Sequence, residues 1–165
     1  MCSSDLRANN RIKEHILRDK GMFVSLLYLL FDSEQGTVRF SNGGQPPPFR
    51  ITPENQKCFM LDFGEANFPL GIMPDVRYEE THFRISPGQI IVLYTDGIIE
   101  TMNPKKEMYG FHRLSELIEK HHQVDADTLL SKILRDVKSF MGRSARHDDI
   151  TVIVLRFEKN GEPEK

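Results

Sequence analysis

The chain has 165 residues, which is enough for one domain with a sizeable core and too few to expect two. Hydrophobic residues make up 39% and charged residues 28%, as in soluble globular proteins, and the net charge of -2 argues against a dedicated nucleic-acid binder. No apolar run approaches the roughly 18–20 residues that cross a bilayer, and no cleavable signal peptide is evident.

The two cysteines, Cys2 and Cys58, provide neither a disulfide framework nor the spacing of metal ligands. A reduced, cytoplasmic setting is therefore the simplest expectation. We expect Cys58 to be a small core residue rather than a reactive thiol.

The first six residues do not have the pattern of a folded element. Translation of a common sequencing adapter gives the same string, so we expect residues 1–6 to be a non-native leader and the natural chain to begin further upstream. From Leu6 to Asp19, apolar residues alternate with charged ones as in the end of an amphipathic helix, and Gly21 is expected to close it.

A nearly unbroken apolar stretch, residues 22–31, predicts a strand buried on both faces, although the pattern alone leaves a buried helix open. A turn signal follows, and the alternation in residues 37–41 predicts a hairpin partner. Residues 42–48 contain two glycines and three prolines, so they must be irregular. Further strands are predicted at 49–52, 57–61, 78–85 and 89–94.

Two helices are predicted next. Residues Phe111, Leu114, Leu117 and Ile118 share one face of the first, and a stripe with a 3.6-residue period runs from Ala126 to Phe140 in the second, which ends at Gly142. Residues 149–157 alternate as a last strand, and residues 158–165 form a charged tail. Several strands, two helices and a final strand predict an α+β layer architecture.

Acidic residues lie at the ends of two predicted strands. Asp96 follows the apolar strand and precedes Gly97, whereas Asp148 and Asp149 come directly before the last strand. If these strands are antiparallel neighbours, the carboxylates project from the same edge of the sheet. Hard cations such as Mg²⁺ and Mn²⁺ favour a few carboxylates together with retained waters.

A plainer interpretation stays open at this point. An acidic residue followed by glycine at a strand end is usually a turn former, and Asp148-Asp149 could merely solvate a loop. The histidines offer no ligand spacing, and His121-His122 is expected to close a helix, where imidazole offsets the helix dipole.

Five short segments, in this order and spacing, resemble the sporulation protein E type of bacterial phosphatase domain, within the metal-dependent protein phosphatase (PPM, or type 2C) family. These segments are 22–28, 41–48, 68–75, 93–100 and 147–152. The resemblance covers the chain from about Leu6 to Phe157, and we interpret residues 7–157 as the C-terminal part of such a domain.

The resemblance implies a partial α-β-β-α sandwich and a two-metal Mn²⁺ or Mg²⁺ centre at the sheet edge. In this family, water activated by the metals attacks the phosphorus of phosphoserine or phosphothreonine directly. By motif match, Asp96 and Asp148 take the catalytic metal-ligand roles. Asp149 is a candidate for supporting those ligands, and Gly97 is expected to let the backbone turn sharply beside the metal.

Two departures from the family pattern stand out. The usual Asn-Ala-Gly-His-Pro loop has Gln45 in place of its histidine, for which we expect a local effect. The family's upstream metal-binding segments have no counterpart before Met22, so we expect this chain alone to bind metal weakly and to have little or no activity. The sheet edge left by the missing strands is expected to be prone to aggregation.

By family analogy, the expected function is a serine/threonine protein phosphatase in bacterial signalling. Its substrate would be a phosphorylated regulatory protein such as an anti-sigma-factor antagonist, and an upstream sensor or receiver domain would belong to the full-length chain. No nucleic acid and no membrane is expected as a partner. The alternatives are a non-catalytic module that binds a phosphoprotein and, more remotely, a small-molecule sensor.

Overall fold

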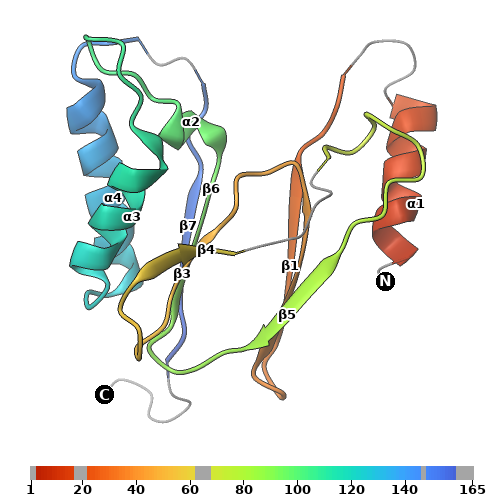
Figure 1. Cartoon of the computed structure of the whole chain (residues 1–165), viewed down its shortest axis with the longest axis horizontal. Coiled ribbons are helices and arrows are strands. Elements are labelled where there is room, and N and C mark those ends of the chain that lie inside the picture. Colours follow the sequence, from red (N-terminus) through yellow and green to blue (C-terminus); the bar gives the residue numbers. More distant parts are fainter. Residues whose placement is uncertain (1–2, 17–21, 62–67, 146–147, 159–165) are drawn as a thin grey trace. The chain divides into compact units, whose positions relative to one another are not determined.

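The computed structural model describes residues 3–16, 22–61, 68–145 and 148–158 (Figure 1). Its described residues form two compact units, the first drawn from 1–47 and 62–85 and the second from 48–61 and 86–165. Among the helices of the described residues, none combines the length and the apolar character needed to span a membrane. Helices and mainly antiparallel sheets occur together, so the predicted α+β class is confirmed.

The first unit contains a three-stranded antiparallel sheet in the order β1-β2-β5. The predicted hairpin is confirmed, because β1 and β2 pair from Leu26↔Gly43 to Asp32↔Thr37. A carboxylate oxygen of Asp32 accepts hydrogen bonds from the backbone nitrogens of the next turn, which fixes the reversal. The strands are β1 (Leu26–Asp32), β2 (Thr37–Gly43) and β5 (Glu80–Arg84).

Strand β1 is not buried on both faces, and that prediction is wrong. Four of its large apolar side chains, Leu26, Tyr28, Leu30 and Phe31, are between 37% and 46% exposed. The reason is its place in the sheet, since among the described strands β1 is hydrogen-bonded to β2 alone. The apolar run therefore predicted the strand correctly but did not predict how exposed its side chains are.

A short helix, α1 (Ser3–Arg11), continues into a π-helical turn, η1 (Ile12–Ile16). The helix begins at Ser3, so the expectation that no folded element starts before Leu6 is wrong. The predicted end of the helix at Gly21 lies outside the described residues. Ala8 and Ile12 of this segment pack against the small core cluster of Leu70, Val76 and Tyr78.

Asn9 is fully buried and joins α1 to the loop of residues 68–78. Its amide nitrogen donates to the Met73 carbonyl at 3.0 Å. Its amide oxygen accepts from the Gly71 nitrogen at 2.8 Å and from the Tyr78 hydroxyl at 3.2 Å. Polar groups that are removed from water need hydrogen-bond partners, and the Asn9 side chain is such a partner for three groups of this loop.

Replacing Asn9 by Ala should therefore destabilise the chain by about 2 kcal/mol, because one buried and two partly buried hydrogen bonds are lost. Urea unfolding of the two proteins measures this difference. The neighbouring Asn10→Ala is the control, since the hydrogen bonds between Asn10 and Asp75 are exposed and the one that Asn10 accepts from the Asn9 amide is long, at 3.4 Å. Equal stabilities of the two variants would contradict the role given to Asn9.

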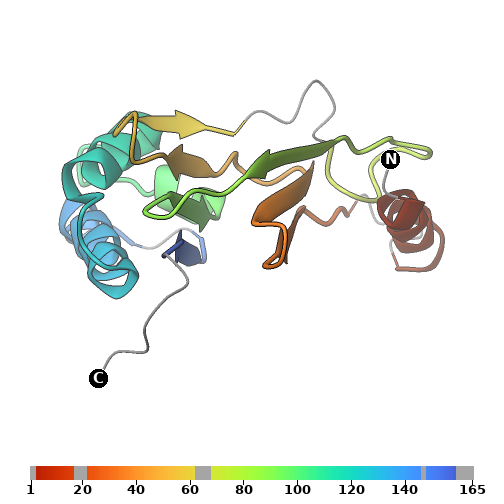
Figure 2. The same ribbon diagram turned by 90° about the horizontal axis from the view of Figure 1, so that it is seen from below.

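The second unit contains a four-stranded antiparallel sheet in the order β4-β3-β6-β7. Its strands, each within three residues of the predicted ends, are β3 (Phe49–Ile51), β4 (Cys58–Met60), β6 (Ile90–Tyr94) and β7 (Val152–Arg156). Helices α3 (Gly110–His121) and α4 (Ala126–Met141) pack side by side on one face of this sheet (Figure 1 and Figure 2). A four-residue helix, α2 (Asp96–Ile99), follows β6 and was not predicted.

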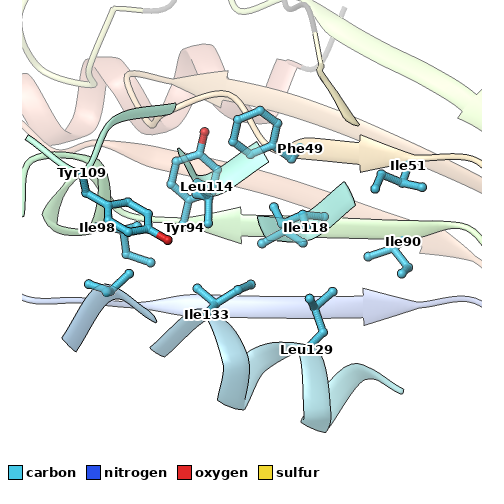
Figure 3. Packing of buried hydrophobic residues seen from close by; sticks show 12 residues of the cluster. Phe49, Ile51, Ile90, Tyr94, Ile98, Tyr109, Leu114, Ile118, Leu129 and Ile133 are labelled. Atoms are coloured by element: carbon cyan, nitrogen blue, oxygen red, sulfur yellow. The ribbon is translucent and has the colours of Figure 1, made fainter. Parts of the chain in front are cut away.

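The core of this unit lies between the sheet and the two helices (Figure 3). Leu114 and Ile118 from α3 and Leu129 and Ile133 from α4 meet the side chains of β3 and β6. The predicted stripes are thus confirmed at their centres but are narrower than expected, because Phe111 and Leu134 are partly exposed. Both helix ends are as predicted, at His121 and at the Gly142 cap.

Cys58 packs against this core. Burial, with the nearby Glu119 carboxylate, raises the pKa of its thiol to about 12. A thiol in this environment stays protonated at neutral pH and is a poor nucleophile. The prediction of a packing role is consistent with this environment.

Candidate metal centre

The pairing of β6 with β7 brings the predicted acidic residues to one edge of the sheet. The two strands are antiparallel neighbours, and their pairing runs up to Tyr94↔Val152. One further hydrogen bond, from the Thr95 nitrogen to the Thr151 carbonyl at 3.1 Å, extends the ladder. Asp96 follows this point on one strand, and Asp148 and Asp149 precede it on the other. The condition on which the sequence argument depended is therefore met.

Thr95 connects the two strand ends, and sequence reasoning did not single it out. Its hydroxyl donates to the Asp149 carbonyl at 3.1 Å and accepts from the Thr151 nitrogen at 3.0 Å. The side chain thus holds the backbone that carries Asp148 and Asp149 against the end of β6. The sequence pattern that could have identified Thr95 is a hydroxyl residue between a buried strand and an acidic turn.

Replacing Thr95 by Val keeps the shape of the side chain and removes the hydroxyl. We expect a loss of about 0.5–1.5 kcal/mol in stability, the net contribution of an intramolecular hydrogen bond, because both hydrogen bonds are exposed and water can replace the hydroxyl. Thr95→Ser should restore most of this loss. Urea unfolding of the three proteins gives the comparison, and equal stabilities would contradict the connection described for Thr95.

Gly97 lies where the backbone of the acidic loop comes closest to α2. A Cβ atom at this position would overlap the carbonyl oxygen of Asp149 and would lie 3.6 Å from the carbonyl carbon of Asp148. The φ angle of Gly97 is not positive, so the turn from β6 into α2 does not need the conformational freedom of glycine. Glycine is needed here because there is no space for a side chain.

Each of the two candidate ligands accepts a hydrogen bond from the backbone nitrogen of the residue that follows it. One carboxylate oxygen of Asp96 accepts from the Gly97 nitrogen at 3.0 Å, and one of Asp148 accepts from the Asp149 nitrogen at 2.7 Å. Both residues are exposed, so their carboxylates are accessible to a cation. The Asp149 carbonyl accepts a hydrogen bond from the Thr95 hydroxyl, and no hydrogen bond of the Asp149 side chain is found among the described residues.

These donors fit a hard divalent cation in kind, since carboxylate oxygens are what Mg²⁺ and Mn²⁺ prefer. They do not suffice in number. Within residues 3–16, 22–61, 68–145 and 148–158, no three His, Cys, Asp or Glu side chains gather as a metal site would require. The described part of the chain therefore offers a pair of carboxylates, Asp96 and Asp148, rather than a full two-metal site.

A cavity of about 90 Å³ lies next to this pair. It is lined by Gly97, Glu100, Thr101, Met102, Met108, Met141, Ala145 and Asp148. The Thr101 hydroxyl donates to the Gly97 carbonyl at 2.6 Å, which ties the cavity wall to α2. Asp148 and Gly97 thus belong both to the acidic edge and to this cavity.

Gln45, which replaces the family's histidine, lies in the first unit. Its side-chain nitrogen donates to the Ser25 hydroxyl at 2.8 Å. Asn42 closes the loop, since its oxygen accepts from the Gln45 nitrogen and its nitrogen donates to the Gln45 carbonyl, each at 2.9 Å. These contacts are local, in keeping with the expected local effect.

Comparison with known proteins gives the family. A family model described as stage II sporulation protein E (SpoIIE) matches residues 6–158. Protein IcfG of Synechocystis sp. is 28% identical over 137 residues, which are 83% of this chain and 21% of that protein. Phosphoserine phosphatase RsbU of Bacillus subtilis is 27% identical over 157 residues, which are 93% of this chain and 44% of that protein. The chain thus spans less than half the length of these relatives.

The fold agrees with this assignment. The manganese-presoaked phosphatase domain of the cell-fate determinant SpoIIE from Bacillus subtilis superposes with a TM-score of 0.66 at 13% identity. The superposition covers all of this chain and 78% of that domain. Other structural neighbours are PP2C domains as well. With a family match over residues 6–158, the chain belongs to the SpoIIE family and has the fold of its PP2C-type phosphatase domains.

Proposed function

We propose that this chain forms part of a metal-dependent protein phosphatase that hydrolyses phosphoserine or phosphothreonine on a regulatory protein. The observation that carries the proposal is the β6–β7 register, which sets Asp96 and Asp148 at one sheet edge in a chain of the SpoIIE family. In the reaction, a bond forms between a water oxygen and phosphorus, and the bond from phosphorus to the serine oxygen breaks. The products are the free hydroxyl and inorganic phosphate.

Asp96 and Asp148 would hold the cation, which is Mn²⁺ or Mg²⁺. When bound, the cation would act as a Lewis acid: it would make water nucleophilic near neutral pH and offset the charge of the phosphoryl oxygens. The chain's own contribution is to position the carboxylates. The Gly97 and Asp149 nitrogens each hold one carboxylate oxygen, and Thr95 holds the two backbone segments together.

Further ligands must come from outside the described residues, since two carboxylates are too few for a stable two-metal site. We therefore propose that this chain alone has little or no activity, and that the complete protein is active. The greater length of IcfG and RsbU is consistent with additional segments. The substrate we propose is an anti-sigma-factor antagonist type of protein in the cytoplasm, and a sensor or receiver domain would provide the input.

The test is hydrolysis of a phosphoserine peptide by the complete protein, measured as phosphate release with and without Mn²⁺. Activity that depends on Mn²⁺ supports the proposal. Binding of the phosphopeptide without any hydrolysis in the presence of Mn²⁺ or Mg²⁺ would favour the alternative, a non-catalytic phosphoprotein-binding module. The retention of both Asp96 and Asp148 speaks against that alternative, because a module that only binds needs neither.

A further inference from the structure

The cavity beside the acidic edge has an apolar lining that the proposed hydrolysis does not require. Three methionine side chains contribute to it from separate parts of the second unit. Met102 and Met108 pair across an isolated antiparallel bridge, and Met141 is the last residue of α4. Thioether side chains are flexible and polarisable, so they adapt to an apolar guest.

The hairpin that carries Met102 and Met108 is held in place by its own hydrogen bonds. The Asn103 side-chain oxygen accepts from the backbone nitrogens of Lys105 and Glu107 at 2.9 and 3.0 Å. The Asn103 amide donates to a Glu107 carboxylate oxygen at 2.7 Å. The cavity wall is therefore fixed before any ligand binds, which lowers the entropic cost of binding.

The hairpin is also tied to α4. The Tyr109 nitrogen donates to the Thr101 carbonyl at 2.8 Å, and the Tyr109 hydroxyl donates to Asp136 of α4 at 2.7 Å. Burial, together with this hydrogen bond, raises the pKa of Tyr109, so its hydroxyl remains a donor near neutral pH. The hydrogen bond from Tyr109 to Asp136 thus joins the hairpin to the helix that carries Met141.

The size and charge of the cavity limit what it can hold. Its volume of about 90 Å³ is smaller than the roughly 150 Å³ of an apolar cavity that binds benzene, so it suits a small aliphatic side chain better than an aromatic ring. Glu100 and Asp148 lie at the same cavity and disfavour an acidic guest. Because Asp148 is also a candidate ligand, a guest here lies next to the reacting phosphate.

We propose that the cavity formed by Met102, Met108 and Met141 takes an aliphatic side chain of the phosphoprotein substrate, from a residue close in sequence to the phosphorylated one. This inference rests on the proposed function, which it extends from a reaction to a preference among substrates. The phosphate is bound at the acidic edge, and the aliphatic side chain sets which phosphorylated residue is placed there.

The experiment compares phosphoserine peptides that differ only in the residues flanking the phosphoserine, either leucine or serine. The complete protein with Mn²⁺ is assayed for kcat/KM on both peptides. We expect a preference of about 10-fold or more for the leucine peptide, the size typical of filling a small apolar pocket. Ala145→Leu, which fills the cavity, and Met108→Ser, which makes it polar, should each reduce this ratio towards one. Met60→Ser, on β4 and outside the cavity, is the matched control and should keep the ratio.

Equal kcat/KM for the two peptides in the unmodified protein would overturn the inference, and so would a ratio unchanged by both cavity variants. If the protein hydrolyses neither peptide, the proposed function fails separately, and binding then decides. The methionine methyl groups, labelled with ¹³C, are observed by NMR while each peptide is added. Shifts of Met102, Met108 or Met141 with the leucine peptide alone would still support the cavity as a binding site, and no shift would overturn it.

Discussion

Replacing Asp96 by Asn in the complete protein is expected to reduce Mn²⁺-dependent hydrolysis of a phosphoserine peptide by about 100-fold or more. Loss of a ligand carboxylate removes several kcal/mol of transition-state stabilisation, and each 1.36 kcal/mol corresponds to about tenfold in rate. The fold should be unaffected, because the Asn side-chain oxygen can still accept the hydrogen bond that the Gly97 nitrogen donates at 3.0 Å. Phosphate release and thermal unfolding are measured on the same samples.

The matched control for this variant is Asp127→Asn. Asp127 is exposed in the first turn of α4, so the same loss of one charge occurs in the same unit but away from the acidic edge. Its activity should equal that of the unmodified protein. Full activity in Asp96→Asn would refute the site assignment, whereas equal losses in both variants would point to a general effect of charge.

Gly97→Ala is expected to destabilise the chain by about 2–3 kcal/mol, the cost of forcing an extra atom into a packed site. Glycine to alanine in a helix normally stabilises by about 1 kcal/mol, so the expected sign is opposite to that of helix propensity. The cause is the Asp149 carbonyl, which occupies the place of the new methyl group and must move away. Because that backbone also carries Asp148, Mn²⁺-dependent activity should fall as well. Urea unfolding and phosphate release measure the two effects.

Gly43→Ala serves as the comparison. Its φ is also not positive, and its new methyl group would meet the tip of the Leu70 side chain at 2.5 Å, whereas the nearest backbone atom, the Leu26 carbonyl oxygen, lies at the ordinary contact distance of 3.4 Å. A side-chain tip can rotate, so the destabilisation should be smaller and activity should be kept. If Gly97→Ala were as stable as the unmodified chain, the close approach of the two backbone segments would be disproved.

Periodic features of the sequence predicted most of the elements. The alternation in β2 and β7 and the stripe in α4 were found because each repeats over several residues. The exposure of β1 could not be predicted, since it depends on which strands lie beside it in the sheet. Helix α2 was missed because four residues carry too little periodicity to be recognised.

The candidate site, like the fold, could be predicted only in part from the sequence. The positions of Asp96 and Asp148 at strand ends could be read from the sequence, and the pairing of β6 with β7 was stated there as a condition. The role of Thr95 and the true reason for Gly97 could not, because both depend on contacts with residues more than 50 positions away in the chain. The methionine cavity was missed because its three methionines have no regular spacing.

The contacts that the structure shows around Asp149 are made by its backbone. Thr95 binds the Asp149 carbonyl, Gly97 leaves space for that carbonyl, and the Asp149 nitrogen holds Asp148. Every residue type except proline supplies the same carbonyl and nitrogen. The geometry of the acidic loop therefore depends on which residues stand at positions 95 and 97 and hardly on which one stands at 149.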